Sequence, residues 1–310
     1  MDGLGKTAHD TDLIVSALQY LDPVVHNGAP APQGPRVLSQ PCVRWRYLPT
    51  AGREPGVSSS FVNLSSLETG HADLVEQVPH HLDLWLDCLS AVGLHARGVT
   101  VALTDEDCAY GPYRGRRADV NCGQVELGEI NWYFEVAGAS DASFSVVDCG
   151  FSFERIAWAA AAPESYHAVL APLHLAGVTD GGVLYDRCRT LALLALFGVR
   201  PGSRGPRRYA RQLADELVAP FLRGVNIPGC LDHAARFWQR FLPAGTGPES
   251  AVAEASEAVE RRAVAVLARV LEQPAPPEQL GFSEAADLLA ARSGGRRTVS
   301  RAVDSLAGPL

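Results

Sequence analysis

The sequence predicts an α+β protein, in which an antiparallel sheet with few helices is followed by an all-α region. Two observations lead to this prediction. Short segments rich in β-forming residues, separated by turns containing glycine and proline, dominate the first 160 residues. From residue 186 onward, apolar residues recur instead at the three- and four-residue spacing of helices. We therefore expect a first domain at 1–162, a helical domain at 163–272, and a linker with a short helical tail at 273–310.

The overall composition limits the class of protein. Of 310 residues, 47% are hydrophobic and 20% are charged, which is the balance of a folded globular chain. The net charge of −8 excludes a protein held to nucleic acid by a generally basic surface, so any RNA contact must be local. No apolar run is long enough to span a membrane and no signal peptide is visible, so we expect a cytoplasmic protein without membrane contact.

Cysteine and histidine usage gives no sign of a metal site. The seven cysteines are widely spaced and form no CxxC pair, which favours free thiols in a reducing compartment. The histidines form no HExxH motif, and the adjacent His80 and His81 are expected at a solvated helix start after Pro79. Lys6 is the only lysine, so every other fixed positive side-chain charge is an arginine.

The elements of the first domain follow from local patterns. Residues 36–47 and 58–66 are rich in β-formers and flank a turn-rich stretch at 48–56, which predicts two antiparallel strands joined by a long loop. Before them, 10–25 is mildly apolar and fits either a helix or a strand. A helix is predicted at 71–92 from its apolar spacing. Further strands are predicted at 97–103, 118–122, 125–136 and 143–148, and a turn at Cys149–Gly150 then leads into an alanine-rich helix that ends at 162.

The second half of the chain is helical by the same criterion. Its predicted helices lie at 186–197, 207–223, 231–242 and 249–272. Residues 273–277 (QPAPP) form a linker, and 282–306 predicts two short helices around Gly294 and Gly295.

Two arginines are the residues best suited to bind a phosphate-bearing substrate. Arg44 lies in a predicted strand just before the long loop, and Arg155 lies at the start of a predicted helix. Arginine offers planar, bidentate donors to phosphate oxygens and can stack on a purine. With Asp148 to hold an ammonium group, such a set fits nucleotidyl transfer from ATP to a carboxylate. The residues alone leave a structural alternative open, in which Arg44 pairs with a surface acid and Asp148 caps the following helix.

Several segments resemble one known family. Residues 39–44 (SQPCVR) resemble motif 2 of class II aminoacyl-tRNA synthetases, in the form found in alanyl-tRNA synthetases. Residues 146–156 (VVDCGFSFERI) resemble motif 3 of that family, whose pattern is roughly VDTGxGLERI, and 125–134 (VELGEINWYF) resembles the strand before it. Downstream, 186–189, 198–199 and 209–211 resemble its helical tRNA-recognition domain. The resemblance covers roughly 36–272.

The resemblance implies a fold and an activity. The fold would be a class II synthetase-like antiparallel sheet flanked by helices, followed by the helical domain. The activity would be that of an ATP-dependent ligase, which uses ATP and Mg²⁺ to convert alanine or another small amino acid to an aminoacyl-adenylate and transfers it to tRNA. No editing domain or C-terminal dimerisation domain is expected within the chain, so we expect a monomer or a weak dimer.

The resemblance also implies roles for single residues. Arg44 would contact the ATP α-phosphate and the substrate carboxylate, and Arg155 would hold the γ-phosphate end or stack on adenine. Asp148 would bind the α-ammonium group, with Asn131 orienting the amino acid and Gly150 leaving room for a small side chain. The full implied ATP site is Arg44, Arg46, Phe61, Val62 and Arg155, and the implied amino-acid site is Asn131, Asp148, Gly150 and Ser152.

The chain departs from the family at several places, and a clear motif 1 is not visible. Residues 62–64 (VNL) stand where the family has a sequence such as FEM, so its acidic residue near adenine and the metal is missing. Ser152 replaces the second glycine of motif 3. The family's loop lysine is absent, and Arg46 or Arg53 is the available substitute.

The helical region offers candidates for RNA contact. They are Arg204, Arg207, Arg208 and Arg211, with Arg200 just before them. The following stretch 214–217 (ADEL) is acidic and would repel phosphates. A solvated turn and helix start is the alternative for this cluster. For the whole protein, two other functions remain open: transfer of the activated amino acid to a carrier protein or small metabolite, and a pseudoenzyme that only binds nucleotide or RNA.

Overall fold

The computed structural model of the chain describes residues 16–70, 76–104, 107–137, 144–161, 166–170, 181–242, 247–277 and 279–307. In these residues the structure is α+β, with a seven-stranded antiparallel sheet and nine α-helices, which confirms the predicted class. The chain divides into two compact units. The first comprises Met1–Thr50 and Glu54–Leu170, and the second comprises Ala51–Arg53 and Ala171–Leu310.

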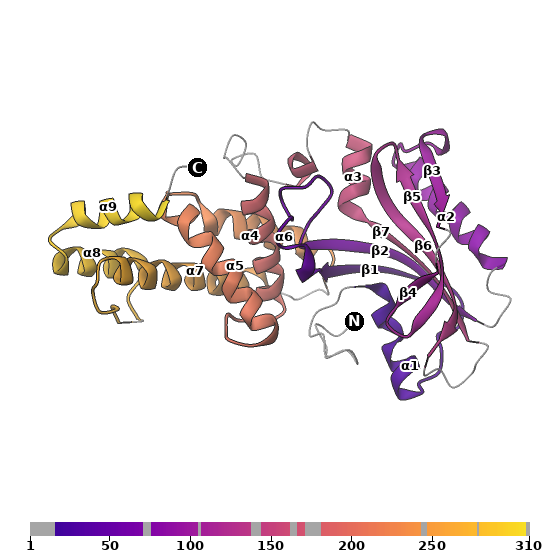
Figure 1. Cartoon of the computed structure of the whole chain (residues 1–310), viewed down its shortest axis with the longest axis horizontal. Helices are drawn as coiled ribbons and strands as arrows, with labels where there is room; N and C mark the ends of the chain where they lie inside the picture. The colour runs from indigo at the N-terminus through magenta and orange to yellow at the C-terminus, as the bar shows by residue number, and fades with distance from the viewer. Residues whose placement is uncertain are drawn as a thin grey trace. The chain divides into compact units, whose positions relative to one another are not determined.

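The first unit is built on the sheet, in which every pairing of the described strands is antiparallel (Figure 1). The strand order is β1-β2-β7-β6-β5-β3, with β4 also paired to β5. The strands are β1 (Arg36–Val43), β2 (Ser60–Gly70), β3 (Val99–Leu103), β4 (Cys108–Tyr110), β5 (Tyr113–Cys122), β6 (Val125–Val136) and β7 (Ser145–Ser152). The predicted strands are therefore present, although β4 and the first half of β5 were not expected.

Side chains alternate between the two faces of the sheet. On β7, Val147, Cys149 and Phe151 enter a core with helix α2 (Val78–Ala91), where Trp85 stacks on Phe151 with ring centroids 4.0 Å apart. Val146 enters a second core on the other face, together with the short helices η1 (Ala17–Leu21) and α1 (Asp22–Asn27). This second face also carries the polar residues discussed below.

Two boundaries in the first unit differ from the sequence prediction. The turn expected at Cys149–Gly150 is wrong, because β7 continues to Ser152 and helix α3 (Phe153–Ala161) begins directly after it. The strand persists because Gly150 is paired on both sides, with Ser65 of β2 and Glu129 of β6. Strand β1 ends at Val43, and Trp45–Tyr47 forms a 3₁₀ turn (η2) where strand was predicted.

Both His80 and His81 were expected to be solvated at the start of a helix, and this prediction is correct only for His80. The side chain of His81 is 1% exposed. Its Nδ1 lies 2.9 Å from the Ser66 hydroxyl, its Nε2 lies 3.0 Å from a Glu68 carboxylate oxygen, and Trp85 donates to the same Ser66 oxygen. Helix α2 begins at Val78, and part of the expected helix (71–75) lies outside the described residues.

The second unit is helical in its described residues (Figure 1). Its helices are α4 (Gly181–Leu196), α5 (Gly205–Leu222), α6 (Ile227–Gln239), α7 (Pro248–Val270), α8 (Phe282–Arg292) and α9 (Arg296–Ala307). A buried arginine joins α4 to α6: Arg189 lies over the rings of Phe237 and Trp238, 4.6 and 4.7 Å from their centroids. The linker at 273–277 has no regular structure, and α8 and α9 flank Gly294 and Gly295 as predicted.

Candidate functional site

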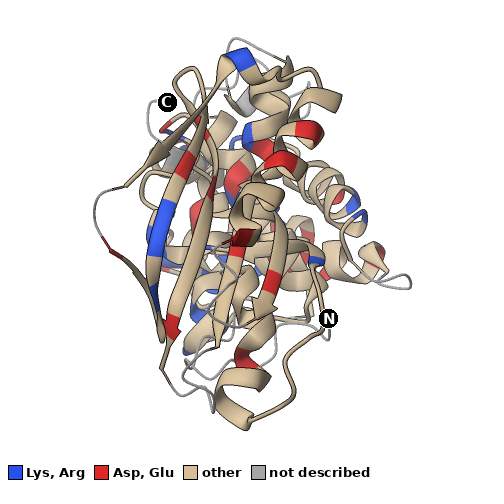
Figure 2. Ribbon diagram, turned by 90° about the vertical axis from the view of Figure 1, so that its right-hand side faces the viewer, with Lys and Arg blue, Asp and Glu red and all other residues tan. Residues whose placement is uncertain are grey.

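The polar face of the sheet carries the candidate site. Along β7 the sequence alternates, so that Asp148, Gly150 and Ser152 share one face while Cys149 and Phe151 fill the core opposite. Side chains on this polar face line two adjoining cavities of the first unit, about 170 and 580 Å³ in volume. Basic and acidic positions lie on neighbouring strands of the sheet (Figure 2).

The first cavity brings together residues that are far apart in the sequence. Of the candidates, Arg44, Phe61, Asp148, Gly150, Ser152 and Arg155 line it. Arg46 lines the second cavity, which shares Arg44, Asp148 and Glu129 with the first. Asn131 and Val62 line neither cavity.

Asp148 is the most unusual ionisable group of this site. Its side chain is 5% exposed, and its Oδ1 atom has no hydrogen-bond partner among the described residues. Burial, reinforced by the nearby charge of Glu129, raises the pKa of Asp148 to about 7, although Arg44 acts in the opposite direction. A buried carboxylate without a partner is costly to maintain, which favours a cationic ligand at this position.

Asn131 supports Asp148 from the neighbouring strand. The two residues are direct partners in the β6–β7 register, and the Asn131 amide donates to the Asp148 main-chain carbonyl over 3.5 Å. The Asn131 side-chain oxygen in turn accepts from the Cys108 thiol at 3.7 Å. Asn131 is 1% exposed, so it positions its neighbours and does not open directly into the cavities.

Beside Gly150, the Asn63 side chain narrows the first cavity. A Cβ atom built on Gly150 would lie 3.3 Å from the Asn63 side-chain oxygen, which is tighter than nine in ten real Cβ contacts. Asn63 is 6% exposed and lines the first cavity beside Gly150. The Asn63 amide group therefore limits the space beside Gly150.

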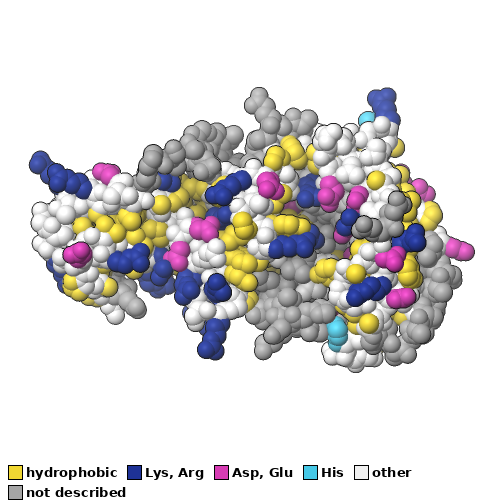
Figure 3. Space-filling view, in the orientation of Figure 1, with side chains coloured by type: hydrophobic (Ala, Val, Ile, Leu, Met, Phe, Trp, Pro, Cys, Tyr) yellow, Lys and Arg dark blue, Asp and Glu magenta, His cyan; other side chains and the backbone are white. Residues whose placement is uncertain are grey.

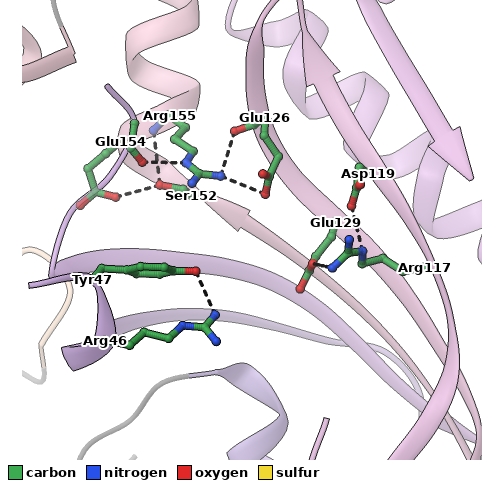
Figure 4. Close-up of polar contacts among 10 residues, drawn as sticks. Arg46, Tyr47, Arg117, Asp119, Glu126, Glu129, Ser152, Glu154 and Arg155 are labelled. Carbon is green, nitrogen blue, oxygen red and sulfur yellow. Dashed lines mark hydrogen bonds and ion pairs between the residues drawn. The ribbon is translucent and has the colours of Figure 1, made fainter. Parts of the chain in front are cut away.

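Arg44 lies directly after β1, where it can reach both cavities. Its main-chain N–H still donates to Ser59, which extends the β1–β2 pairing by one residue. Its guanidinium lies over the ring of Phe61, 4.8 Å from the centroid. Although burial acts to raise it, the pKa of Tyr47 is lowered because Arg44 and Arg46 favour the phenolate. Arg46 donates to the Tyr47 hydroxyl over 2.9 Å (Figure 4).

Arg155 lies on the first turn of α3 and crosses to β6. Its Nε donates to the Gly56 carbonyl at 3.0 Å, and its Nη1 lies 3.0 Å from a Glu126 carboxylate oxygen (Figure 4). Ser152, one of the expected amino-acid contacts, accepts from the Arg155 main-chain N–H at 3.4 Å. Ser152 therefore serves as a cap for α3 in addition to lining the cavity.

Val62 faces away from the cavities. Its side chain is completely buried, and its main-chain N–H donates to both carboxylate oxygens of Glu154 at 3.1 Å. Glu154 is itself fully buried and also accepts from the Ser152 hydroxyl at 3.3 Å. A buried carboxylate therefore lies beside β2 even though the sequence of β2 contains none at this point.

The sequence interpretation missed four side chains of this site: Tyr47, Glu126, Glu129 and Glu154. A usable signal existed for Glu129, because it lies two residues from Asn131 and therefore on the same face of β6. Arg117 of β5 holds Glu129, with 3.5 Å between Nη1 and the carboxylate, and also pairs with Asp119 at 2.9 Å (Figure 4).

The arginine candidates of the second unit lie at the start of α5. Arg207 and Arg211 line a cavity of about 610 Å³. None of Arg204, Arg207, Arg208 and Arg211 has a side-chain partner among the described residues. Figure 3 shows Lys and Arg side chains spread over the helical unit. The acids that follow are paired, Asp215 with Arg262 and Glu216 with Arg187.

Among the described residues, no group of three or more His, Cys, Asp or Glu side chains could hold a metal ion. No helix in the described part of the chain is long and apolar enough to cross a membrane. No protein-family model and no curated protein matches the chain.

Proposed function

We propose that the protein is an alanyl-tRNA synthetase-like ligase, which activates a small amino acid with ATP and transfers it to tRNA. One observation carries the proposal. Arg44, Asp148 and Arg155, which come from three separate segments, line a single cavity in which Asp148 presents a buried, unpartnered carboxylate oxygen. This is the arrangement that adenylation of an amino acid requires: an anion for the ammonium group and cations for phosphate and carboxylate.

The sheet topology supports a class II synthetase fold for the first unit. The segment that resembles motif 2 forms β1, and the segment that resembles motif 3 forms β7 and the first turn of α3. The strand that bears Asn131 is β6. The order β1-β2-β7-β6 makes these elements contiguous, so that residues from all of them act at one face.

In this proposal each charged side chain has a distinct part. The ionised carboxylate of Asp148 binds the α-ammonium group of the substrate. Arg44 neutralises the substrate carboxylate and the α-phosphate as the carboxylate oxygen attacks phosphorus and pyrophosphate leaves. Adenine stacks near Phe61, over which the Arg44 guanidinium lies at 4.8 Å.

Arg155 and Glu126 would receive the distal phosphates. Their ion pair, 3.0 Å long, is half-exposed, since 52% of the Glu126 side chain is accessible. Phosphate oxygens can therefore replace the carboxylate as the partner of Arg155. Mg²⁺ enters as part of the substrate MgATP, which fits a site without a ready-made cluster of carboxylates in its described residues, and Glu126 is the side chain available to contact it.

The transfer to tRNA rests on the second unit. Acids at Asp215 and Glu216 would repel RNA if they were unpaired, but both have arginine partners within the unit. Their net effect on phosphates is therefore small, while Arg207 and Arg211 keep their charges available. This balance favours tRNA over a carrier protein or small metabolite as the acceptor.

The decisive experiment is ATP–pyrophosphate exchange with each of the twenty amino acids. We expect exchange that depends on one amino acid or a few, followed by charging of total tRNA in the same buffer. If the folded protein supports no exchange with any amino acid, the adenylation proposal fails and the protein is a pseudoenzyme for this reaction. Exchange without tRNA charging would instead support another acceptor.

A further inference from the structure

Around Asp148 the site is narrow on the side of Gly150 and wider on the side of β4. Toward Gly150 the first cavity, of about 170 Å³, is narrowed by the Asn63 amide, whose oxygen lies 3.3 Å from the position of a Cβ atom. On the other side, Asp148 borders the second cavity of about 580 Å³. A substrate held by its ammonium group at Asp148 therefore finds room for a side chain toward β4 and away from Gly150.

The wall of the second cavity around Asp148 is polar. Cys108 and Tyr110 of β4 and Tyr133 of β6 line it. Tyr133 is 3% exposed and Cys108 is partly buried, and burial raises the pKa of both groups, which keeps them neutral hydrogen-bonding groups near neutral pH. The Cys108 thiol already donates to Asn131, so a ligand that hydrogen-bonds to this wall would donate to the hydroxyl oxygens of Tyr110 and Tyr133.

Arg117, one of the arginines that line the second cavity, is already matched by acids. Arg117 pairs with Asp119 at 2.9 Å and with Glu129 at 3.5 Å. A charged side chain that enters beside Arg117 would have to break these pairs to gain a partner, whereas an uncharged polar side chain would not. The part of the second cavity beside Arg117 is therefore suited to hydroxyl or amide groups.

We propose that the amino acid activated here carries an uncharged polar side chain longer than a methyl group, bearing a hydroxyl or an amide, and that this side chain enters the cavity lined by Cys108, Tyr110 and Tyr133. The inference rests on the proposed adenylation of an amino acid, and it names the substrate class of that site. Alanine would leave the second cavity to water and would make no contact with these three residues.

The size of the expected preference follows from the chemistry of the wall. One methylene more or less in an apolar pocket changes selection by about 10- to 200-fold. A site that hydrogen-bonds a polar group rejects the apolar isostere more strongly, because its own buried groups lose their partners. Polar and apolar amino acids of equal size are therefore the sharpest comparison.

The test compares three matched pairs, threonine with valine, asparagine with leucine and glutamine with methionine, alongside alanine, lysine and glutamate. Binding is measured by calorimetry at pH 8, and kcat/KM by ATP–pyrophosphate exchange. We expect at least one polar member to exceed both its apolar partner and alanine by more than tenfold. A ranking led by alanine, glycine or an apolar amino acid overturns the inference while leaving adenylation intact.

Binding separates the two proposals. If no amino acid supports exchange but a polar member still binds more than tenfold better than its isostere, adenylation fails and the substrate class stands. If no amino acid binds, the inference fails as well. Cys108→Leu adds bulk to the cavity and is expected to lower both the affinity and kcat/KM for the preferred amino acid by at least tenfold. The matched control is Cys88→Leu, at an exposed thiol on α2, which should change neither value.

Discussion

Asp148 and Asn131 lie directly opposite each other on β7 and β6, and the Asn131 amide holds the main-chain carbonyl of Asp148. This contact orients the strand position from which the Asp148 carboxylate reaches the cavity. Because Asn131 is buried and does not line either cavity, its proposed contribution is positional. The carboxylate itself is the group expected to meet the substrate.

Replacement of Asp148 by asparagine should abolish amino-acid-dependent exchange. The substitution keeps the size of the side chain but removes the charge that pairs with ammonium, so we expect kcat/KM to fall by about 100-fold or more, which corresponds to roughly 3 kcal/mol. Arg155→Ala should also lower exchange, through a higher KM for ATP. Circular dichroism checks that both variants are folded, and unchanged exchange in either would show that its assigned role is wrong.

The affinity for the amino acid should depend on pH with a midpoint near neutrality. Burial raises the pKa of Asp148 to about 7, so that below this pH the carboxyl is neutral in the free protein. We expect the KM for the amino acid to rise by up to about tenfold for each pH unit below the midpoint. Steady-state kinetics between pH 5.5 and 8.5 measure this, and a flat profile would contradict an ionised Asp148 as the binding group.

The same group should make the protein less stable as pH rises. In the folded protein the Asp148 carboxyl keeps its proton up to about pH 7. Its ordinary pKa is 3.8, so the unfolded state loses this proton at a lower pH. The stabilisation is therefore complete below about pH 4 and is lost as pH rises through 7. Asp148→Asn removes this loss and should be more stable than the wild type at pH 8, by at most about 4 kcal/mol. Urea unfolding at several pH values measures the difference, which should vanish near pH 4.

Much of the architecture could be predicted from the sequence because its signals are local. Alternation along β7 and the spacing of apolar residues in the helices each lie within a short segment. The end of β7 could not be predicted in this way. Glycine is usual in turns, and only the pairing of Gly150 with Ser65 and Glu129 on both sides keeps the strand extended.

Only part of the candidate site could be predicted from the sequence, because its residues come together through tertiary contacts. Arg44 and Asp148 were chosen for their chemistry, and their presence at one cavity depends on strands that are about a hundred residues apart in the chain. The partners that complete the site arise from tertiary contacts. Glu154 accepts a hydrogen bond from the main chain of Val62, and Glu126 pairs with Arg155. No spacing in the sequence predicts either contact.

His81 provides a stability test that the sequence did not suggest. Its two ring nitrogens contact Ser66 and Glu68 in the interior, whereas the adjacent His80 is exposed. His81→Ala removes a partner from both residues and should lower the free energy of unfolding by about 1–3 kcal/mol. His80→Ala is the matched control and should change it by less than about 0.5 kcal/mol. Equal effects in urea denaturation would show that the buried network contributes nothing.

Binding of tRNA should depend on salt through α5. Arg207 and Arg211 have no side-chain partner among the described residues, so they can exchange counterions for phosphates. Removal of both by Arg207→Ala and Arg211→Ala should weaken tRNA binding and reduce the slope of log K against log salt by about 1 to 2. Arg236→Ala is the control, because Arg236 is exposed but pairs with Asp232 at 2.8 Å. Filter binding between 50 and 300 mM salt gives the slopes.

An unchanged slope in the double variant would exclude α5 from the RNA contact. Absence of binding at the lowest salt would favour an acceptor other than tRNA.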